Sequence, residues 1–510
     1  MNQGERKKKM KKEDIIKKLV SDFGLMPAKA KGASYEQMAD IWINEIPKQV
    51  VLYSTEANND GMLSIKLSKL KKEQFGYTNK SGRLNKWFID NFPLWNELSK
   101  GYSCKSGKKE YTKIAGGQIW LDVLEDLDAS MILDIYNKSV KDVIEYDEIE
   151  IDLDNIIAYY KHTKKSYDNG KGESKFFRYT YEALFIMKLA VAYNKIVTCS
   201  STGKTKHLIP QHYEFSSFGR KYYQGSIRLQ ACNEMVRHGA LGECYALDIN
   251  ASVYAYYQNV AERDYNIDKD IIAVVRTIVY SKDSIRELLA DKLTNTKATK
   301  KEKIKLVKTA LTALGFGARI DNERGVMKNI IFDLEDRRAF LSDPIIKDLT
   351  LFYKSLTSAI IDLTNSDAGK ELKADLKAMP QLITHVIRNN PLKDNYDPDE
   401  PTVEFDRLKM TAVMAYFYQQ EETRIMKHII SALKADGNDT LLWVHDGIYI
   451  KNKPDMKLIE NVTKTIGTTL TFSCEEVSLW DLTHKNEDIA KKKQIKAENQ
   501  MMKKQSLFNT

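Results

Sequence analysis

Apolar residues recur along the chain with two different periods, which predict helices separated by short strands. From about 120 to 200, the segments WLDVLEDLDASMILDIYNKSV and YTYEALFIMKLAVAYNKI repeat apolar residues at the helical spacing, with the lysine-rich stretch KHTKKSYDNGKGESK between them. This region is predicted to form two long helices joined by a basic loop. Helices are also expected through much of the chain up to about residue 434, followed by a helix in MKLIENVTKTIG.

Short apolar runs interrupt the helical pattern and predict strands in CYALDIN, LLWVHDGIYI and LTFSCEEVSL. The second run, residues 441–450, is unusual because it contains the ionisable pair His445-Asp446. Burial of an unpaired carboxylate is unfavourable. We therefore expect another group in the folded protein to neutralise Asp446.

The length and composition predict a folded protein with two or three lobes. A chain of 510 residues and 58.6 kDa is too long for one compact core, and its hydrophobic content of 43% is that of a globular protein. The formal charge of +9 includes clustered lysines at 6–12 and 491–493. Such runs are more often solvated termini than nucleic-acid contacts, so charge alone does not decide the function.

Cysteine usage and hydropathy favour a cytoplasmic location. The five cysteines form no C-x-x-C pair, so neither a disulfide framework nor a zinc site is indicated. No apolar run approaches the roughly 20 residues of a membrane span, and the basic N-terminus lacks the apolar centre of a signal peptide. We therefore expect a cytoplasmic protein with no membrane partner.

The stretch STGKT at 201–205 is similar to the end of a phosphate-binding P-loop. Thr198 occupies the position at which that loop needs a glycine. A hairpin turn is therefore the better interpretation, and no nucleotide site is predicted there.

Two aspartates at the ends of predicted strands are candidate catalytic residues. Asp248, in ECYALDINASVYAYY, follows one strand, and Asp446 lies in another about two hundred residues later. Asp248 alone is equally well explained as a helix N-cap. Together, the pair suits two divalent cations that activate a hydroxyl and stabilise a leaving oxygen in phosphoryl transfer. Because Mg²⁺ needs few protein carboxylates, a bound metal would explain how Asp446 stays ionised.

Between the aspartates, KEKIKLVKTALTALGFGARI places Lys301, Lys305 and Lys308 on one face of a predicted helix that ends at the glycines of GFG. A solvated lysine face explains this pattern when it is considered alone. The functional interpretation is a helix that binds a triphosphate through Lys308 and presents Phe316 as a platform for a base or base pair.

Together these segments resemble family A polymerases, which include bacterial and phage DNA polymerases and single-subunit phage RNA polymerases. Asp248 lies where motif A has its metal-binding aspartate, the spacing from Lys308 to Phe316 is that of motif B, and VHDGI is similar to motif C. The resemblance implies that Asp248 and Asp446 ligate two Mg²⁺ ions. It also implies that Lys308 binds the phosphates of an incoming nucleoside triphosphate and that Phe316 stacks at the nascent base pair.

Two further segments follow the family order. FGRKYYQGSIRLQ, with Arg220 and Gln230, is similar to elements that precede motif A, and YFYQQEETRIMKHIISAL, with Gln419, is similar to the helix that enters motif C. The resemblance implies that Arg220, Gln230, Gln419 and His445 bind the primer-template nucleic acid.

The resemblance covers about 210–485 and implies an α+β, right-hand polymerase fold with an antiparallel palm sheet and helical fingers and thumb. The predicted division is an N-terminal region of unknown role at 1–115, a thumb-like helical region at 116–205, palm and fingers at 206–485, and a basic C-terminal tail at 486–510.

The sequence departs from the family at positions that handle phosphate and sugar. Ile304 replaces the motif B arginine, which leaves Lys305 beside it as a substitute that lacks bidentate phosphate binding. Val253 stands where the DNA polymerases have a glutamate and the RNA polymerases have a glycine, and it is a further nucleotide-binding candidate. Phe316 lacks the tyrosine hydroxyl of the RNA polymerases, and Gly447 replaces the residue that follows the motif C aspartate. The preferred sugar is therefore left open.

The ends of the chain add little chemistry. The tail KKQSLFNT, with Gln505, Leu507 and Phe508, loosely resembles peptides that dock on sliding clamps, although a plain tail explains it as well. We find no Asp-x-Glu strand for a proofreading exonuclease in the first 200 residues.

These features predict a template-directed nucleotidyltransferase, a DNA polymerase that extends a primer in phage or plasmid replication. One alternative is a DNA-directed RNA polymerase or primer-synthesising enzyme, which Val253 favours. The other is a non-catalytic replication accessory that binds nucleic acid.

Overall fold

The computed structural model describes most of the chain from residue 111 to 477, with gaps at 116, 141, 169–174, 199–202, 266, 318–325, 389–396, 400–401 and 469, and short pieces before residue 111. The chain forms two compact units. Unit 1 comprises Met1–Glu214, Tyr222–Cys244 and Glu476–Thr510, and unit 2 comprises Phe215–Lys221 and Tyr245–Glu475. The boundaries expected from sequence stay predictions, and most of the regions 1–115 and 486–510 lies outside the described residues.

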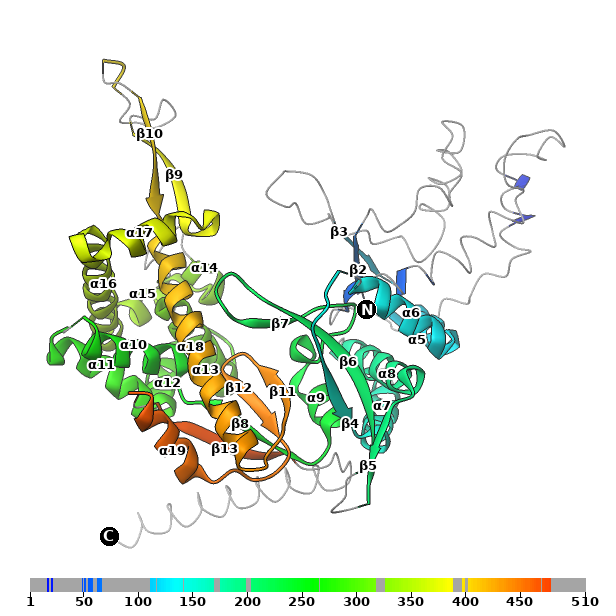
Figure 1. Ribbon diagram of the computed structural model, residues 1–510. Helices are drawn as coiled ribbons and strands as arrows, with labels where there is room; N and C mark the ends of the chain where they lie inside the picture. Colours follow the sequence, from blue (N-terminus) through cyan, green and yellow to red (C-terminus); the bar gives the residue numbers. More distant parts are fainter. Residues whose placement is uncertain are drawn as a thin grey trace, which may run out of the picture. The chain divides into compact units, whose positions relative to one another are not determined.

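Unit 1 combines two small antiparallel sheets with helices (Figure 1). Its sheets have the strand orders β1-β2-β3 and β4-β6-β5, and β7 pairs with β6. Fully buried aromatic side chains, including Trp120, Tyr159 and Phe177, form its core. The elements are β1 (Ser54–Ala57), β2 (Met62–Lys66), β3 (Tyr111–Ala115), α5 (Gly117–Asp126), α6 (Ala129–Ser139), β4 (Tyr146–Ile151), α7 (Leu153–Asp168), α8 (Lys175–Tyr193), β5 (Ile196–Thr198), β6 (Thr205–Phe215), β7 (Lys221–Tyr223), η5 (Leu229–Ala231) and α9 (Glu234–Leu241).

The region 120–200 differs from the two long helices expected from its periodicity. It contains α5, α6, α7 and α8, with β4 between the second and third. The Asp128 side chain accepts a hydrogen bond from the Ser130 N–H at 2.8 Å and so begins a new helix, α6. Much of the expected basic loop belongs to α7. The hairpin expected around STGKT is confirmed, because β5 and β6 pair antiparallel with Thr198 opposite Thr205.

Unit 2 is built around a four-stranded sheet with the order β11-β12-β8-β13. The strands are β8 (Cys244–Ile249), β11 (Thr440–Val444), β12 (Gly447–Ile450) and β13 (Phe472–Val477), and β12 pairs antiparallel with both β11 and β8. The predicted strands at CYALDIN and LTFSCEEVSL are confirmed. The single strand predicted for LLWVHDGIYI is wrong, since the run folds as the hairpin of β11 and β12.

Helices make up most of the rest of unit 2. The helix α18 contacts α10, α19 and β11, and the hairpin of β9 and β10 projects from the helical part of the unit (Figure 1). The elements are α10 (Ser252–Arg263), α11 (Lys269–Tyr280), α12 (Lys282–Asp291), α13 (Lys300–Gly315), α14 (Val326–Ile330), α15 (Leu334–Ser342), α16 (Pro344–Asn365), η6 (Asp367–Gly369), α17 (Lys370–Lys377), η7 (Pro380–Leu382), β9 (Ile383–Arg388), β10 (Val403–Leu408), α18 (Met410–Ala435) and α19 (Met456–Thr465).

The core of unit 2 joins these helices to the sheet. Buried side chains such as Tyr257, Phe352 and Ile429 from the helices pack in one cluster with Leu247 and Ile450 from the strands. Burial of such side chains contributes about 1.5–3 kcal/mol each. The cluster therefore gives the carboxylates at the strand ends a rigid support. The predicted mixture of helices with an antiparallel sheet is confirmed.

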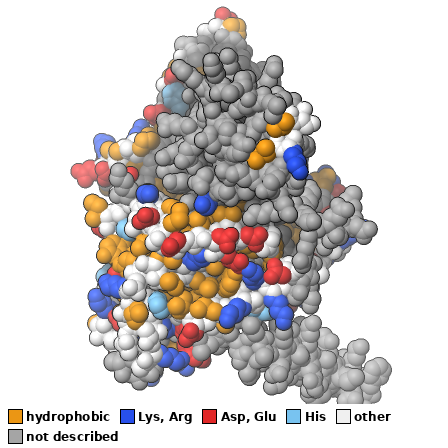
Figure 2. Space-filling view, turned by 90° about the vertical axis from the view of Figure 1, so that its right-hand side faces the viewer, with side chains coloured by type: hydrophobic (Ala, Val, Ile, Leu, Met, Phe, Trp, Pro, Cys, Tyr) orange, Lys and Arg blue, Asp and Glu red, His pale blue; other side chains and the backbone are white. Residues whose placement is uncertain are grey.

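The described residues on one face of the molecule carry charges of both signs. Figure 2 shows one face of the molecule, where hydrophobic side chains of the described residues gather and a band of acidic and basic side chains crosses them. In the part of the chain that the structure describes, no helix has the length and apolar character needed to cross a membrane.

Candidate active site

The two predicted catalytic aspartates lie at the same end of the unit 2 sheet. Asp248 on β8 is the register partner of Gly447, the residue that follows Asp446. The backbone N–H of Ile249 donates to the carbonyl oxygen of Asp446 at 3.1 Å. Both aspartates line one cavity of about 340 Å³. The structure therefore brings together two residues that lie about two hundred positions apart in the sequence.

The turn between β11 and β12 explains how an acidic pair interrupts an apolar run. Val444 pairs with Gly447, so His445 and Asp446 form a two-residue hairpin turn. His445 adopts a φ of +54°, the left-handed conformation that tight hairpins require. Asp446 is thus at the exposed end of a hairpin rather than inside a strand, and its side chain faces the cavity.

Gly447 leaves room for the Asp248 carboxylate beside the turn. A Cβ atom at this position would lie 2.9 Å from Oδ1 of Asp248 and 3.1 Å from the carbonyl oxygen of Leu247. Any side chain there would displace the Asp248 carboxylate. The glycine that departs from the family pattern therefore has a local steric reason.

The surroundings of Asp248 disfavour the charged form of its carboxylate. Its pKa is raised from the ordinary 3.8 to about 7. Burial is the largest cause and the charge of Asp446 adds to it, while Lys282 and Lys308 act in the opposite direction. Two neighbouring carboxylates are unfavourable when both are charged, so either a proton or a cation is expected to neutralise one of them.

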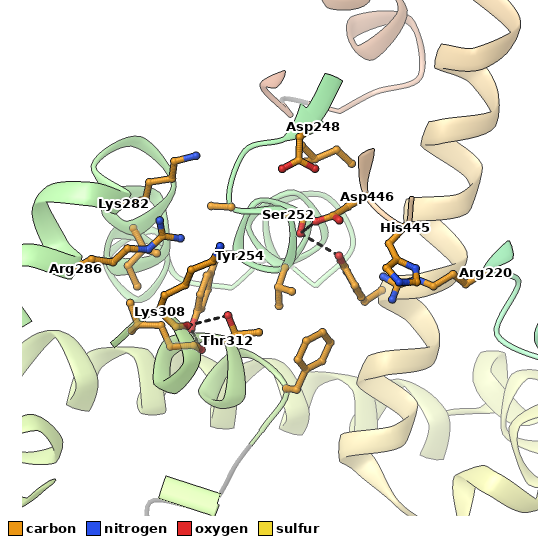
Figure 3. A pocket seen from close by; sticks show the side chains of 17 residues that line it. Arg220, Asp248, Ser252, Tyr254, Lys282, Arg286, Lys308, Thr312, His445 and Asp446 are labelled. Carbon is orange, nitrogen blue, oxygen red and sulfur yellow. Dashed lines mark hydrogen bonds between the residues drawn. The ribbon is translucent and has the colours of Figure 1, made fainter. Parts of the chain in front are cut away.

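Three cationic side chains line the cavity opposite the carboxylates. Lys308 comes from α13, and Lys282 and Arg286 lie one helical turn apart on α12 (Figure 3). The Lys282 ammonium donates to Oδ1 of Asn250 at 3.0 Å, and Arg286 donates to Oδ1 of Asp283 at 3.1 Å. Carboxylates and cations on opposite sides of one cavity suit a ligand with a phosphate chain and a metal-binding end.

The helix α13 begins and ends at defined signals. Thr299 and Glu302 form a capping box, in which the Thr299 N–H donates to Glu302 Oε2 at 2.7 Å and the Glu302 N–H donates to Thr299 Oγ1 at 3.3 Å. At the other end, Gly317 has a φ of +75°, and a Cβ there would lie 2.0 Å from the Tyr353 hydroxyl. Only glycine fits this position, and it places Phe316 at the cavity.

Aromatic and apolar side chains form the part of the cavity between the charged groups. The Phe316 ring packs edge-on against the Tyr418 ring at a centroid distance of 5.6 Å. Val253 is 8% exposed, and a Cβ on Gly315 would lie 3.0 Å from its Cγ1. The helices α10 and α13 therefore approach closely there, and Val253 and Phe316 give the cavity an apolar wall.

Two of the predicted nucleic-acid contacts, Arg220 and His445, also line the cavity. Arg220 is already paired with the carboxylate of Glu422, through Nε at 2.9 Å from Oε1 and through Nη2 with Oε2. Its guanidinium lies 5.6 Å from the centroid of the Tyr418 ring. The structure thus assigns Arg220 a buried ion pair within unit 2 in addition to its place at the cavity.

Three predicted site residues are not placed at the cavity. Lys305 is exposed on α13 and Gln419 is half-buried on α18, and neither lines it. Gln230 belongs to unit 1, where its Oε1 accepts a hydrogen bond from the Tyr223 N–H at 3.4 Å. The roles of these three residues stay predictions. The tail residues Gln505, Leu507 and Phe508 lie outside the described residues.

Sequence reasoning missed Lys282, Arg286 and Ser252. The two cations are spaced four residues apart on a short helix, a pattern that is common on solvated surfaces and carries no link to Asp248 in the sequence. Ser252 lies four residues after Asp248, and its contact with Asp446 depends on the fold. Only the spacing of Lys282 and Arg286 offered a signal.

Comparison with known proteins gives little further guidance. No protein-family model matches the sequence, and no curated protein matches it. Among solved structures, the chain is similar to the POL domain of Pol1 from M. smegmatis, a complex with DNA primer-template and dNTP. The match covers 86% of this chain and 70% of that chain at 10% sequence identity, with a TM-score of 0.36. A TM-score this low carries no argument about function.

Proposed function

We propose that the protein is a template-directed nucleotidyltransferase, a DNA polymerase that extends a primer by phosphoryl transfer. The observation that carries this proposal is the meeting of Asp248 and Asp446 across one cavity from Lys282, Arg286 and Lys308. The sequence resemblance to family A polymerases independently selects both aspartates and Lys308. Under this proposal unit 2 supplies the palm and fingers of a right-hand polymerase.

The donor set fits Mg²⁺. Within the described residues, no group of three or more His, Cys, Asp or Glu side chains is arranged to hold a metal ion. Mg²⁺ commonly uses one or two carboxylates and completes its coordination with water and substrate phosphates. The raised pKa of Asp248 supports this assignment, because a divalent cation would relieve the repulsion that causes part of it. Asp248 and Asp446 would hold the two ions.

The residues of the chain have separate roles in the proposed reaction. Lys308, Lys282 and Arg286 neutralise the triphosphate and the charge that develops on the leaving pyrophosphate. Phe316 and Val253 hold the base and sugar against α13 and α10. When bound, Mg²⁺ supplies a lower pKa for the attacking hydroxyl and stabilises the leaving oxygen.

One of these cationic residues can replace the arginine that motif B lacks in this chain. Ile304 stands at that position and Lys305 does not line the cavity, whereas Arg286 of α12 does. An arginine provides two parallel donors for phosphate oxygens, which a lysine does not. We propose that Arg286 supplies the guanidinium contact from a different helix.

Primer extension tests the proposal. A labelled primer-template is incubated with Mg²⁺ and either dNTPs or NTPs, using wild-type protein, Asp446→Asn and the exposed-surface control Asp375→Asn. We expect extension by the wild type and the control and none by Asp446→Asn. Extension with NTPs alone would favour an RNA polymerase or primer-synthesising enzyme. Tight primer-template binding without extension by the wild type would favour a non-catalytic accessory.

A further inference from the structure

A chain of two part-buried hydrogen bonds reaches one of the two candidate metal-binding carboxylates. The Ser252 hydroxyl, at the first turn of α10, donates to Oδ2 of Asp446 at 2.6 Å. The Tyr418 hydroxyl, on α18, donates to Ser252 Oγ at 3.0 Å. Figure 3 shows Ser252 beside Asp446 in the centre of the site. These contacts join α10, α18 and the β11–β12 turn, all within unit 2.

The direction of this chain is fixed by the chemistry of its members. An ionised carboxylate only accepts hydrogen bonds, so Ser252 is the donor to Asp446 and uses a lone pair to accept from Tyr418. Burial raises the pKa of Tyr418 well above its usual range, and the charge of Glu422 adds to this. The Tyr418 hydroxyl therefore stays protonated and remains a donor, which the Glu422 carboxylate shares with Ser252 as acceptor. Its side chain is only 3% exposed, and the guanidinium of Arg220 lies over its ring.

Backbone strain lies on both sides of the contact. Among the described residues, three other than glycine have a positive φ, and two of them are Ala251 at +47° and His445 at +54°. Ala251 directly precedes Ser252 and His445 directly precedes Asp446. A left-handed conformation costs about 1–2 kcal/mol for such residues and tends to persist where function requires it. Here it aims the two side chains at each other.

Ser252 is not explained as a helix cap. The N-cap position of α10 belongs to Ala251, and no side chain caps the helix there. The Ser252 hydroxyl is instead committed to a residue 194 positions away in the chain. Because Ser252 holds Oδ2, the plane of the Asp446 carboxylate is set and Oδ1 remains for a ligand in the cavity.

We propose that Ser252 is a positioning residue that orients Asp446 for metal binding, with Tyr418 holding the serine hydroxyl in place. The proposal rests on the function proposed above, because it assumes that Asp446 is a metal ligand. Hydrogen-bonding partners of metal ligands typically change metal affinity or activity about 10–100-fold when they are removed. Neither Ser252 nor Tyr418 was a candidate from the sequence.

Two readouts test the role of Ser252. Mn²⁺ affinity is measured by electron paramagnetic resonance in the absence of nucleotide and nucleic acid, and kcat and nucleotide KM are measured by primer extension. For Ser252→Ala we expect Mn²⁺ affinity and kcat to fall about 10–100-fold, with the nucleotide KM within about twofold because the cations on α12 and α13 are unchanged. Ser252→Thr keeps the hydroxyl and should restore both values.

Tyr418→Phe should produce a smaller loss of the same kind, since it removes only the outer hydrogen bond. The matched control is Tyr416→Phe, which removes a hydroxyl from the same helix, and Ser284→Ala serves as the serine control. Thermal unfolding confirms that each variant is folded.

Three results would overturn the proposal. The first is a Mn²⁺ affinity of Ser252→Ala equal to that of the wild type. The second is an equal loss of Mn²⁺ affinity in Ser252→Ala and Ser252→Thr, which would indicate a packing role. The third is the absence of Mn²⁺ binding by the wild type. If the wild type binds Mn²⁺ but extends no primer, the proposed polymerase function fails, while the affinity of Ser252→Ala still decides the positioning role.

Discussion

Replacing Asp248 with asparagine should remove a pH-dependent loss of stability from the metal-free protein. The folded-state pKa of Asp248 is about 7, against an ordinary value of 3.8. Between these two values the folded protein keeps a proton that the unfolded chain has released. The free energy of unfolding therefore falls as pH rises from about 4 to about 7. An asparagine at this position does not titrate, so it does not contribute this decrease in the free energy of unfolding.

The size of the effect follows from the pKa and from exposure. A rise from 3.8 to about 7 corresponds to an upper limit of about 4 kcal/mol, at about 1.4 kcal/mol per tenfold change in proton affinity. Asp248 is exposed to solvent, which screens the interaction, so we expect about 1–2 kcal/mol. For a unit of this size that is a change of about 2–8 °C in the melting temperature.

The assay compares thermal unfolding of the wild type and Asp248→Asn at pH 5 and pH 8 in the presence of EDTA. Asp248→Asn should gain stability relative to the wild type as pH rises, and the exposed-surface variant Asp375→Asn should not. Mg²⁺ at ten times its Kd should then stabilise the wild type at pH 8 by about 1.4 kcal/mol, with a much smaller effect on Asp248→Asn. Parallel pH profiles for wild type and Asp248→Asn would refute the reasoning.

Three further substitutions test the walls of the cavity. Lys308→Ala should raise the nucleotide KM roughly 10–100-fold, because it removes a charged hydrogen bond to phosphate. The control Lys305→Ala, one turn away and outside the cavity, should change the KM less than about twofold. Equal KM values for the two variants in steady-state extension would contradict the assignment of Lys308. Arg286→Lys should keep the charge but raise the KM several-fold through loss of the two-donor contact, and an unchanged KM would show that Arg286 does not contact phosphate. Gly317→Ala should destabilise the protein by about 2–4 kcal/mol, because position 317 has a positive φ and an added Cβ would meet Tyr353. An unchanged free energy of unfolding in chemical denaturation would contradict this description of the C-terminal end of α13.

The sequence predicted which residues meet at the cavity better than it predicted the elements that carry them. Asp248, Asp446, Lys308 and Phe316 could be identified because each belongs to a short local pattern, and the structure places all of them around one cavity. The expected strand through His445 was wrong, since the conformation of a two-residue turn depends on a positive φ that an apolar run does not reveal.

The remaining residues of the site depend on tertiary contacts. Lys282 and Arg286 face the cavity only because α12 packs beside α13, and Ser252 reaches Asp446 only because β8 and β12 are neighbours. Lys305 lies outside the cavity although it shares the helical spacing of Lys308, because that spacing does not specify which lysines face a ligand; its role stays a prediction. Strand register and helix packing therefore determine which of these residues reach the cavity, and local sequence patterns do not.

The most direct test of the central claim is incorporation of a single nucleotide on a primer-template whose next template base is varied. The account predicts that the wild type adds the complementary nucleotide in a Mg²⁺-dependent reaction. It also predicts that Asp446→Asn loses incorporation by at least about a thousandfold while its affinity for the primer-template stays within a few-fold. Incorporation that survives in Asp446→Asn, or that ignores the template base, would contradict the account.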